Sequence, residues 1–340
     1  MRQAVMLAPG LIEHREVPEP AEPVGHEVLL RIKNIGICGS DIHVFFGEHP
    51  ATPYPVVQGH EYAAIVESVG DMVKKAKPGM RATARPQQTC GMCGPCRKGL
   101  YNACLNLKVE GFQAPGVAQD LFLVPEERLV IFPDSMSFEQ GAMIEPAAVG
   151  AHATGRAGSL DGKNVVVSGS GTIGIMVAQF ARIRGAGKIL ITDKSDFRLD
   201  LARKCGITGT LNISKTPFEE GVTRYFGSAG FQAAFEAAGT EDALKVLLQY
   251  VEKGGTVVIL GVYAKNPSVN MYYLGEHELN VLGSMMYLHE DYEMARDMIA
   301  SGKISTAPMI TAHFPFMNFL DAYRHIEQQG DKTLKVMIDM

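Results

Sequence analysis

The spacing of apolar residues changes along the chain, and each change predicts a different kind of element. Apolar and polar residues alternate in HEVLLRIKNIG, residues 26–36, which is typical of a half-buried β-strand. From Lys163 onward, KNVVVSG and KILITD are short apolar runs of the buried-strand type. The segment between them, GTIGIMVAQFARIRG, has the spacing of a helix. The pattern therefore changes from strand-like alternation to alternating strands and helices.

The alternation continues to residue 304. FQAAFEAAG and TVVILGV are strand-like and flank TEDALKVLLQYVEKGG, a helical segment closed by glycines. HELNVLGSMMY, residues 277–287, has the pattern of a last strand, and EDYEMARDMIASGKI that of a helix. This order predicts an α/β fold with a parallel, doubly wound sheet.

Three glycines at the turn between the first of these strands and its helix predict a dinucleotide site. Gly169, Gly171 and Gly174 form G-x-G-x-x-G, with Thr172 and Ile173 inside the motif. The first glycine permits the tight turn, the second lets the backbone approach a pyrophosphate, and the third allows close helix–strand packing. The N-terminus of the helix then faces the anion.

The next strand ends at Asp193, where a carboxylate would accept hydrogen bonds from an adenosine ribose. Since a carboxylate there repels a 2′-phosphate, NAD is favoured over NADP. Arg198, five residues later, either reaches the same ribose or is a solvated charge on a helix.

Four of the six cysteines lie in CGMCGPCRKGLYNAC: Cys90, Cys93, Cys96 and Cys104. Four thiolates satisfy the tetrahedral preference of zinc and leave no open position. A bacterial ferredoxin shares C-x2-C-x2-C, but its fourth cysteine follows after three residues and precedes proline. Disulfides are disfavoured in a chain without an export signal. The spacing predicts a structural zinc lobe, residues 88–106, that takes no part in the chemistry.

A second possible metal site combines Cys38, in GICGSDIH, with His60 and Glu61, in QGHEY. A cysteine, a histidine and a carboxylate can bind zinc and leave one position open. Alone, this triple is weak support, because an isolated cysteine in a core is usually a small hydrophobic residue.

Composition limits the classes of function. A chain of 340 residues favours two domains. The net charge of −5 provides no electrostatic footprint for nucleic acid or anionic lipid. No apolar run is long enough to span a membrane, and the first residues lack the apolar region of a signal peptide. We therefore expect a cytoplasmic protein with neither nucleic-acid nor membrane partners.

Taken together and in order, GICGSDIH, GHE, the four-cysteine lobe, MIEPAAVGAHA, SGSGTIG and FEAAG resemble the zinc-containing medium-chain dehydrogenases. The resemblance covers nearly the whole chain and is strongest to the sorbitol (polyol), threonine and sugar-alcohol branch. It implies a GroES-like, mostly-β catalytic domain, residues 1–148 and 288–340, interrupted by a Rossmann NAD-binding domain, residues 149–287. It also implies two zinc ions per chain, one catalytic and one structural, and a homotetramer or homodimer.

The resemblance also implies roles for single residues. Cys38 and His60 correspond to ligands of the catalytic zinc. The third ligand corresponds to Glu145, with Glu61 as the alternative. Ser40 and His43 correspond to a proton relay, and these two residues with Glu61 and Glu145 make up the expected catalytic set. Asp41 corresponds to the residue that orients the zinc-binding imidazole.

The activity implied is transfer of hydride between NAD and a secondary hydroxyl of a polyol, sugar alcohol or sugar acid, with or without a phosphate group. Met286 stands where sorbitol dehydrogenases have an arginine, which argues against sorbitol itself. The candidates for substrate contact are Phe45, Phe46, Phe112 and Tyr287. A primary-alcohol, aldehyde or threonine-type dehydrogenase, and a catalytically silent nucleotide-binding protein, are the alternatives.

Overall fold

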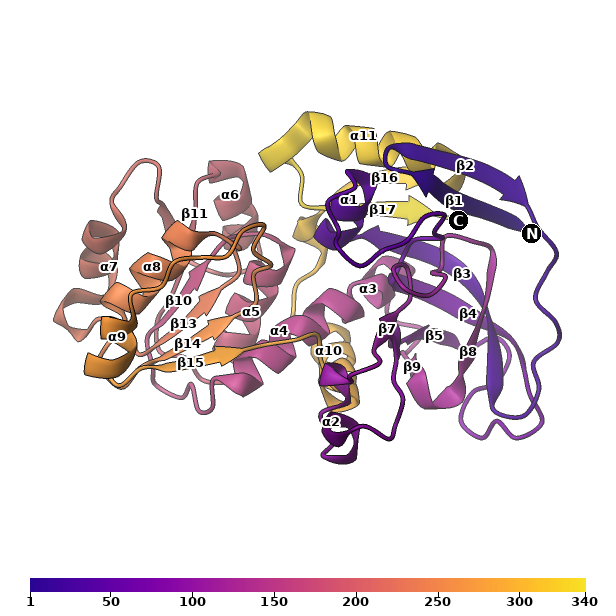
Figure 1. The fold of residues 1–340 in the computed structure, drawn as a ribbon, viewed down its shortest axis with the longest axis horizontal. Helices are drawn as coiled ribbons and strands as arrows, with labels where there is room; N and C mark the ends of the chain where they lie inside the picture. Colours follow the sequence, from indigo (N-terminus) through magenta and orange to yellow (C-terminus); the bar gives the residue numbers. More distant parts are fainter. The chain divides into compact units, whose positions relative to one another are not determined.

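The computed structural model describes residues 1–340 and divides them into two compact units. Unit 1 comprises Met1–Glu145, Leu288–Ser301 and Ile310–Met340, and unit 2 comprises Pro146–Tyr287 and Gly302–Met309. Unit 2 is therefore inserted in the sequence of unit 1 (Figure 1). Residues 302–309 belong to unit 2, although they lie within the range expected for the catalytic domain.

Unit 2 is built on a parallel sheet of six strands. They are β10 (Val165–Ser168), β11 (Ile189–Asp193), β12 (Gly209–Asn212), β13 (Ala233–Glu236), β14 (Thr256–Ile259) and β15 (Asn280–Gly283). Their spatial order is β12-β11-β10-β13-β14-β15. The order reverses at β10, and ligands of such sheets bind beyond the carboxyl ends of the strands at this point. The expected doubly wound sheet is confirmed.

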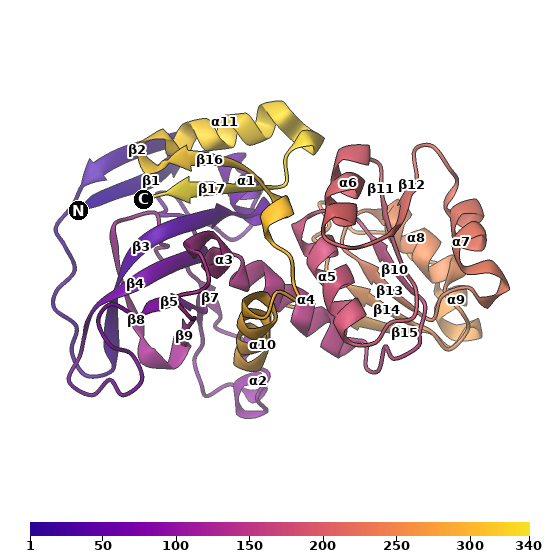
Figure 2. The same cartoon turned by 180° about the vertical axis from the view of Figure 1, so that it is seen from behind.

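Helices cover both faces of this sheet (Figures 1 and 2). They are α4 (Ile144–Arg156), which begins in unit 1, α5 (Thr172–Ile183), α6 (Asp196–Lys204), α7 (Phe218–Phe226), α8 (Glu241–Tyr250) and α9 (Met271–Glu276). Right-handed crossovers place α5 and α6 on one face and α7 and α8 on the other. Burial explains the apolar strand sequences: the three valines of β10 are fully buried.

The last strand of unit 2 is shorter than the sequence pattern indicates. Only Asn280–Gly283 pairs with β14, whereas the apolar pattern covers residues 277–287. Glu278 and Met286 have φ values of 54° and 48°, in the left-handed region that no strand residue adopts. These two residues bound the strand on either side.

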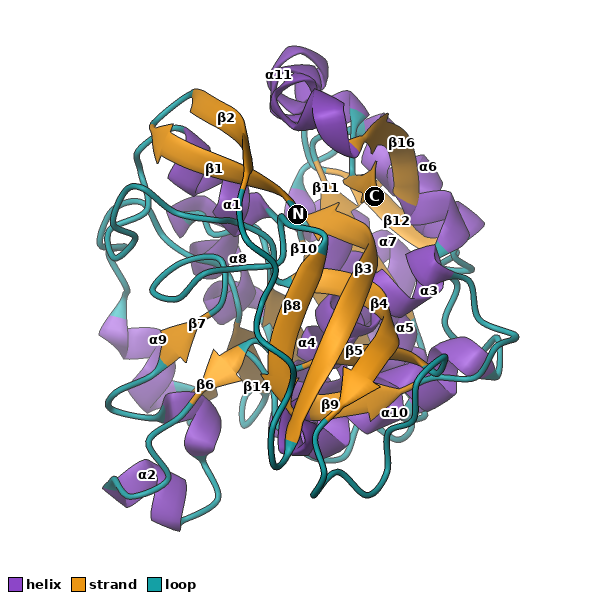
Figure 3. Ribbon diagram, turned by 90° about the vertical axis from the view of Figure 1, so that its right-hand side faces the viewer, coloured by secondary structure: helices purple, strands orange, loops and turns teal.

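Unit 1 is mostly β-structure. Its strands are β1 (Arg2–Ala8), β2 (Leu11–Glu16), β3 (Glu27–Ile37), β4 (Glu61–Val69), β5 (Arg81–Ala84), β6 (Gln87–Gln88), β7 (Lys108–Val109), β8 (Leu121–Pro125), β9 (Leu129–Ile131), β16 (Ile310–Pro315) and β17 (Lys335–Asp339). Seven of them form one sheet, in which β3 pairs with β4, β8 and β17. Figure 3 shows β8, β3, β4 and β5 side by side.

The helices of unit 1 are α1 (Gly39–Phe45), α2 (Gly94–Arg97), α3 (Phe138–Ala142), α10 (His289–Ala300) and α11 (Phe319–Gln329). Strand β3 shows the expected alternation, since Val28, Leu30 and Ile32 are buried and Arg31 is exposed. Helix α11 lies along β16 and β17 (Figure 2). None of the helices of the chain is both long and apolar enough to cross a membrane.

Candidate metal centres and cofactor site

The pairing of β3 with β4 brings the first candidate ligands together. The two strands are antiparallel, and Gly36 at the end of β3 lies opposite Glu61 at the start of β4. Cys38 follows β3 and caps α1, while His60 directly precedes β4. One ligand atom each of Cys38, His60 and Glu61 lies within 4.8 Å of the others. Three such donors in one place fit a zinc ion.

Asp41 lies beside the imidazole of His60. Oδ1 of Asp41 lies 3.4 Å from Nδ1 of His60, and both side chains are buried. The other carboxylate oxygen, Oδ2, accepts a hydrogen bond from the backbone N–H of Cys38 at 2.9 Å. Burial alone would lower the pKa of His60, but Asp41 and Cys38 raise it well above its usual value. An imidazole oriented by a carboxylate through one nitrogen is the usual arrangement of a zinc-binding histidine.

A buried lysine contacts Glu61, and the sequence analysis missed it. Nζ of Lys335 in β17 forms an ion pair with Oε2 of Glu61 and donates to the carbonyl of Ile37 at 3.0 Å. Both charged side chains are about 98–99 % buried. A Cβ at Gly36 would overlap Oε2 of Glu61, so a larger residue there would displace this carboxylate. The one signal in the sequence is a lysine at the start of an apolar strand, KVMID.

Glu145 lies near this pair without joining the group of three. It is in the first turn of α4 and is 5 % exposed. Its charge raises the pKa of Lys335 and of Tyr292, although burial is the largest influence on both. The set of ligand atoms within 4.8 Å contains Glu61 and not Glu145. The identity of the third ligand therefore stays a prediction.

The two expected relay residues lie on α1. Oγ of Ser40 donates a hydrogen bond to Sγ of Cys38 at 3.2 Å. The ring of His43 is exposed, and its Nδ1 lies 3.0 Å from Oε2 of Glu48. Ser40 is thus beside a candidate ligand, and His43 is in contact with solvent.

The candidates for substrate contact differ in their surroundings. Phe112 packs on His60 with its ring centre 5.0 Å from the imidazole. Phe45 is a core residue stacked on Tyr323, and Tyr287 is completely buried. Phe46 is 42 % exposed. Of the four, Phe112 is the residue in ring contact with a candidate ligand.

The four cysteines of the lobe converge, with all four Sγ atoms within 4.8 Å of one another. Sγ of Cys104 accepts hydrogen bonds from the backbone N–H groups of Cys90 and Asn106, each at 3.3 Å. Backbone N–H groups, first that of Met92, lower the pKa of the Cys90 thiol to about 6. Such donors stabilise thiolates, the form that binds metal. The cluster fits one tetrahedral zinc ion.

The three motif glycines differ in what surrounds them. Gly169 has a φ of +100°, and a Cβ there would lie 2.9 Å from the backbone of Ala237. A Cβ at Gly174 would overlap the carbonyl of Gly169. At Gly171, which caps α5, a Cβ would meet nothing within 4 Å. The fold itself leaves no room for a side chain at Gly169 or Gly174. At Gly171 the space is open, which fits the close approach of a pyrophosphate. Thr172 and Ile173 form the first turn of α5 beside it.

Asp193 ends β11 and lines a cavity of about 360 Å³. Its carboxylate accepts hydrogen bonds from the backbone N–H groups of Ser170, at 2.7 Å, and Ser195, at 2.8 Å. The carbonyl of Arg198 accepts from Oγ of Ser170 at 3.0 Å. Gly169, Lys194 and Phe218 contribute to the cavity wall, together with the first turn of α8. Gly169, the first glycine of the motif, and the expected ribose acid therefore border one cavity.

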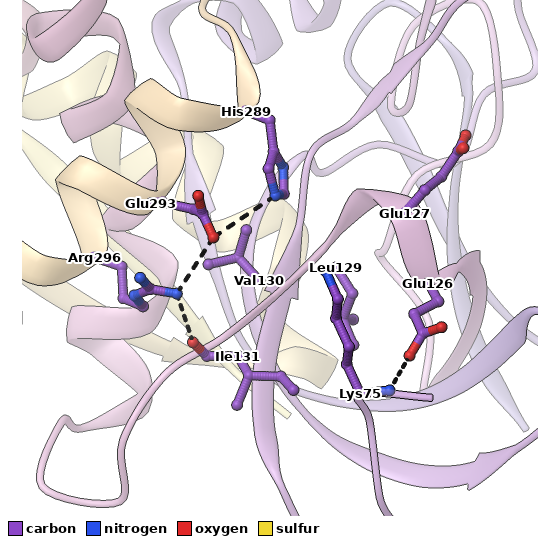
Figure 4. Close-up of a pocket in the computed structure, with 9 residues that line it drawn as sticks. All are labelled: Lys75, Glu126, Glu127, Leu129, Val130, Ile131, His289, Glu293 and Arg296. Atoms are coloured by element: carbon purple, nitrogen blue, oxygen red, sulfur yellow. Dashed lines mark hydrogen bonds and ion pairs between the residues drawn. The ribbon is translucent and has the colours of Figure 1, made fainter. Parts of the chain in front are cut away.

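A smaller hollow in unit 1 has a volume of about 140 Å³ and is shown in Figure 4. The carboxylate of Glu293 lies near both His289 and Arg296, and that of Glu126 accepts hydrogen bonds from backbone N–H groups, including that of Lys75. Glu293 is thus paired within the hollow, Glu126 is held by backbone groups, and the residues expected at the active site lie elsewhere.

Two family models match the chain. Residues 25–134 match the alcohol dehydrogenase GroES-like domain, and residues 172–301 match the zinc-binding dehydrogenase family. The expected fold class, a GroES-like domain with a Rossmann domain, is confirmed.

Relatives that align over nearly their whole length also belong to the dehydrogenases. The sorbitol dehydrogenase of Bacillus subtilis is 31 % identical and is aligned over 99 % of this chain and 97 % of its own. The 2-dehydro-3-deoxy-L-galactonate 5-dehydrogenase of Pseudoalteromonas atlantica is 30 % identical over 92 % of each chain. Among solved structures, a Sinorhizobium meliloti protein described as a zinc-binding dehydrogenase, bound to NADP, has a TM-score of 0.93 and 30 % identity, covering 100 % of this chain and 99 % of its own.

Proposed function

The chain belongs to the zinc-containing medium-chain dehydrogenases, and on this premise we propose that it interconverts a secondary hydroxyl of a polyol, sugar alcohol or sugar acid with the ketone, using NAD. The observation that carries the proposal is the group formed by the partly buried Cys38 and the buried His60 and Glu61, with Asp41 behind the imidazole. The names of the two relatives, a sorbitol and a deoxygalactonate dehydrogenase, support this class of substrate.

We assign the residues around the group as follows. Cys38 and His60 would hold the catalytic zinc with one of the two carboxylates, Glu61 or Glu145. When bound, zinc lowers the pKa of a hydroxyl that it coordinates, and NAD accepts a hydride. Cys90, Cys93, Cys96 and Cys104 hold the structural zinc.

In the oxidation, the hydroxyl proton and the carbon-bound hydrogen leave separately. The proton passes to Oγ of Ser40, which is 3.2 Å from the sulfur of Cys38, and on toward His43. The exposed ring of His43 releases the proton to solvent. NAD, when bound, would take up the carbon-bound hydrogen with its electron pair, so the overall products would be a ketone, NADH and one proton.

NAD would bind along the glycine motif, where Asp193 could accept hydrogen bonds from its adenosine ribose. The carboxylate at the edge of the cavity supports this assignment, since it disfavours a 2′-phosphate. The NADP in the Sinorhizobium structure shows that a similar protein binds the phosphorylated cofactor, which makes the preference of this chain a point to measure.

A homo-oligomer, a tetramer or a dimer, is also proposed. Strand β15 is an edge of the unit 2 sheet, and the exposed apolar residues Met271, Tyr272 and Met285 lie close to it in sequence. An unprotected edge of this kind favours association. The expectation of a cytoplasmic location stays a prediction.

The function is tested by following NAD reduction with C3–C6 polyols, aldonates and their phosphates. Ethanol, butanol and threonine are the contrasts for the alternative activities. We expect the highest kcat/KM with a secondary hydroxyl of a polyol or sugar acid. A higher kcat/KM for a primary alcohol or for threonine would refute the substrate class and leave the zinc and NAD assignments standing.

A further inference from the structure

The loop after α1 holds a second histidine near the zinc site, and the proposed mechanism does not use it. The backbone N–H of His49 donates to the carbonyl of His43 at 3.2 Å. Nδ1 of His49 lies 2.7 Å from Oγ1 of Thr52. These two bonds fold the loop back on itself, so the orientation of the half-buried imidazole is fixed.

Phe112 connects this ring to the candidate metal ligand. The ring of Phe112 lies 4.9 Å from that of His49, at an angle of 32°, and 5.0 Å from that of His60, at 50°. Nε2 of Gln113 donates to the carbonyl of Ala51 at 3.2 Å, which ties the loop to the same segment. The three rings thus form a row, with a ligand at one end, an apolar ring in the middle and a polar ring at the other end.

The chemistry of His49 is that of a neutral donor. Burial lowers the pKa of its ring, and the neighbouring His43 lowers it further, against a smaller opposing effect of Asp41. A neutral imidazole has one N–H donor and one acceptor nitrogen. When the Thr52 hydroxyl donates to Nδ1, the hydrogen of the ring is on Nε2 and can be donated to another molecule.

We propose that His49 is a specificity-determining residue that donates a hydrogen bond to a distal hydroxyl of the substrate, while Phe112 packs against the carbon chain between this hydroxyl and the reacting carbon. The inference rests on the proposed function and narrows its substrate: the preferred polyol has a hydroxyl beyond the carbons adjacent to the reacting one. A site that hydrogen-bonds a substrate hydroxyl rejects an analogue without it, because the polar group of the protein is then left unpaired.

The test is the ratio of kcat/KM for a C5 or C6 polyol to kcat/KM for 2-butanol, which has the secondary hydroxyl and lacks the distal ones. His49→Phe keeps a ring against Phe112 and removes the donor. We expect this ratio to fall by about 10- to 100-fold, mainly through KM of the polyol. His49→Gln, which restores an N–H donor, should recover part of the loss. His313→Phe in β16 is the matched control and should leave the ratio unchanged.

A ratio that is unchanged in His49→Phe would overturn the inference, whether both activities fall together or neither falls. That result would assign His49 to the structure of the loop. The two proposals fail separately: a wild type that oxidises no secondary alcohol refutes the proposed function, whereas an active wild type with an unchanged ratio in the variant refutes the role of His49 alone.

Discussion

At the scale of single residues, unit 1 buries more charge than the sequence indicates. Lys335 pairs with Glu61 behind the candidate zinc ligands. Arg128 pairs with Glu110, which is completely buried, with 2.5 Å between Nη1 and Oε1. Breaking the Lys335–Glu61 pair is costly, because one charge is then left unpaired in a medium that solvates it poorly. Glu110 differs, since burial raises its pKa to about 7 despite Arg128. Both pairs can therefore be examined by substitution.

Lys335→Met should destabilise the protein through the charge left on Glu61. Loss of one partner of a buried ion pair costs about 3–5 kcal/mol. We expect the Tm of the protein in scanning calorimetry to fall by roughly 5–15 °C. Glu61→Gln removes the unpaired charge. The double variant Lys335→Met with Glu61→Gln should therefore be more stable than Lys335→Met alone. A double variant that is no more stable would show that the two side chains do not depend on each other.

Glu110 should make stability depend on pH. Burial raises the pKa of its carboxyl from 4.5 to about 7, against the opposing effect of Arg128. Between these pH values the unfolded chain loses the proton and the folded chain keeps it, so this group lowers stability as pH rises through the interval. The cost above pH 7 is on the order of 3 kcal/mol.

Glu110→Gln, which imitates the protonated carboxyl, should match the wild type near pH 5 and exceed its Tm near pH 8. Thermal unfolding at a series of pH values measures this difference. Parallel curves for the two proteins would contradict the raised pKa of Glu110.

At the scale of elements, the motifs with local spacing were predicted best. The glycine turn between β10 and α5 and the four-cysteine lobe each lie within a short segment, so spacing alone indicates their geometry. The sheet of unit 2 was also predicted, because each of its strands and helices has its own local pattern of apolar residues.

Features that depend on distant segments could not be predicted. Lys335 and Glu61 are 274 residues apart in sequence, and only the pairing of β17 and β4 with β3 brings them together. The left-handed backbone of Met286, which keeps residues 277–287 from forming one continuous strand, is not indicated by residue type. The choice between Glu61 and Glu145 as third ligand is of the same kind, since each carboxylate is placed by a different element.

The turn after β11 should determine cofactor preference. Asp193→Ser combined with Lys194→Arg removes a repulsion and adds a partner for a 2′-phosphate. We expect the ratio of kcat/KM for NADP to that for NAD to rise at least about tenfold. The kcat/KM for NAD should fall as well, in part because the variant lacks the two backbone hydrogen bonds that Asp193 accepts.

Asp196→Ser, at the exposed start of α6, is the control for the loss of one negative charge. It should leave the ratio unchanged. A wild type with the higher kcat/KM for NADP would refute the assignment of Asp193.

At the scale of the whole molecule, the free edge of β15 predicts association. Light scattering at micromolar concentration should give a mass of two or four times 36.8 kDa. Met285→Glu introduces a charge next to the edge and should shift the mass toward the monomer. Met92→Glu, at an exposed position of the lobe, should not. A wild-type mass of 36.8 kDa under these conditions would refute association through the edge of β15.

We propose that one chain holds two zinc ions with separate roles, and elemental analysis of purified wild type and Cys38→Ser measures this. The wild type should contain two zinc ions per chain. Cys38→Ser should keep one, in the lobe, remain folded and reduce no NAD, whereas Cys93→Ser should lose stability because structural zinc contributes to folding. One zinc ion per wild-type chain, or a Cys38→Ser protein that still reduces NAD with a polyol, would contradict the account.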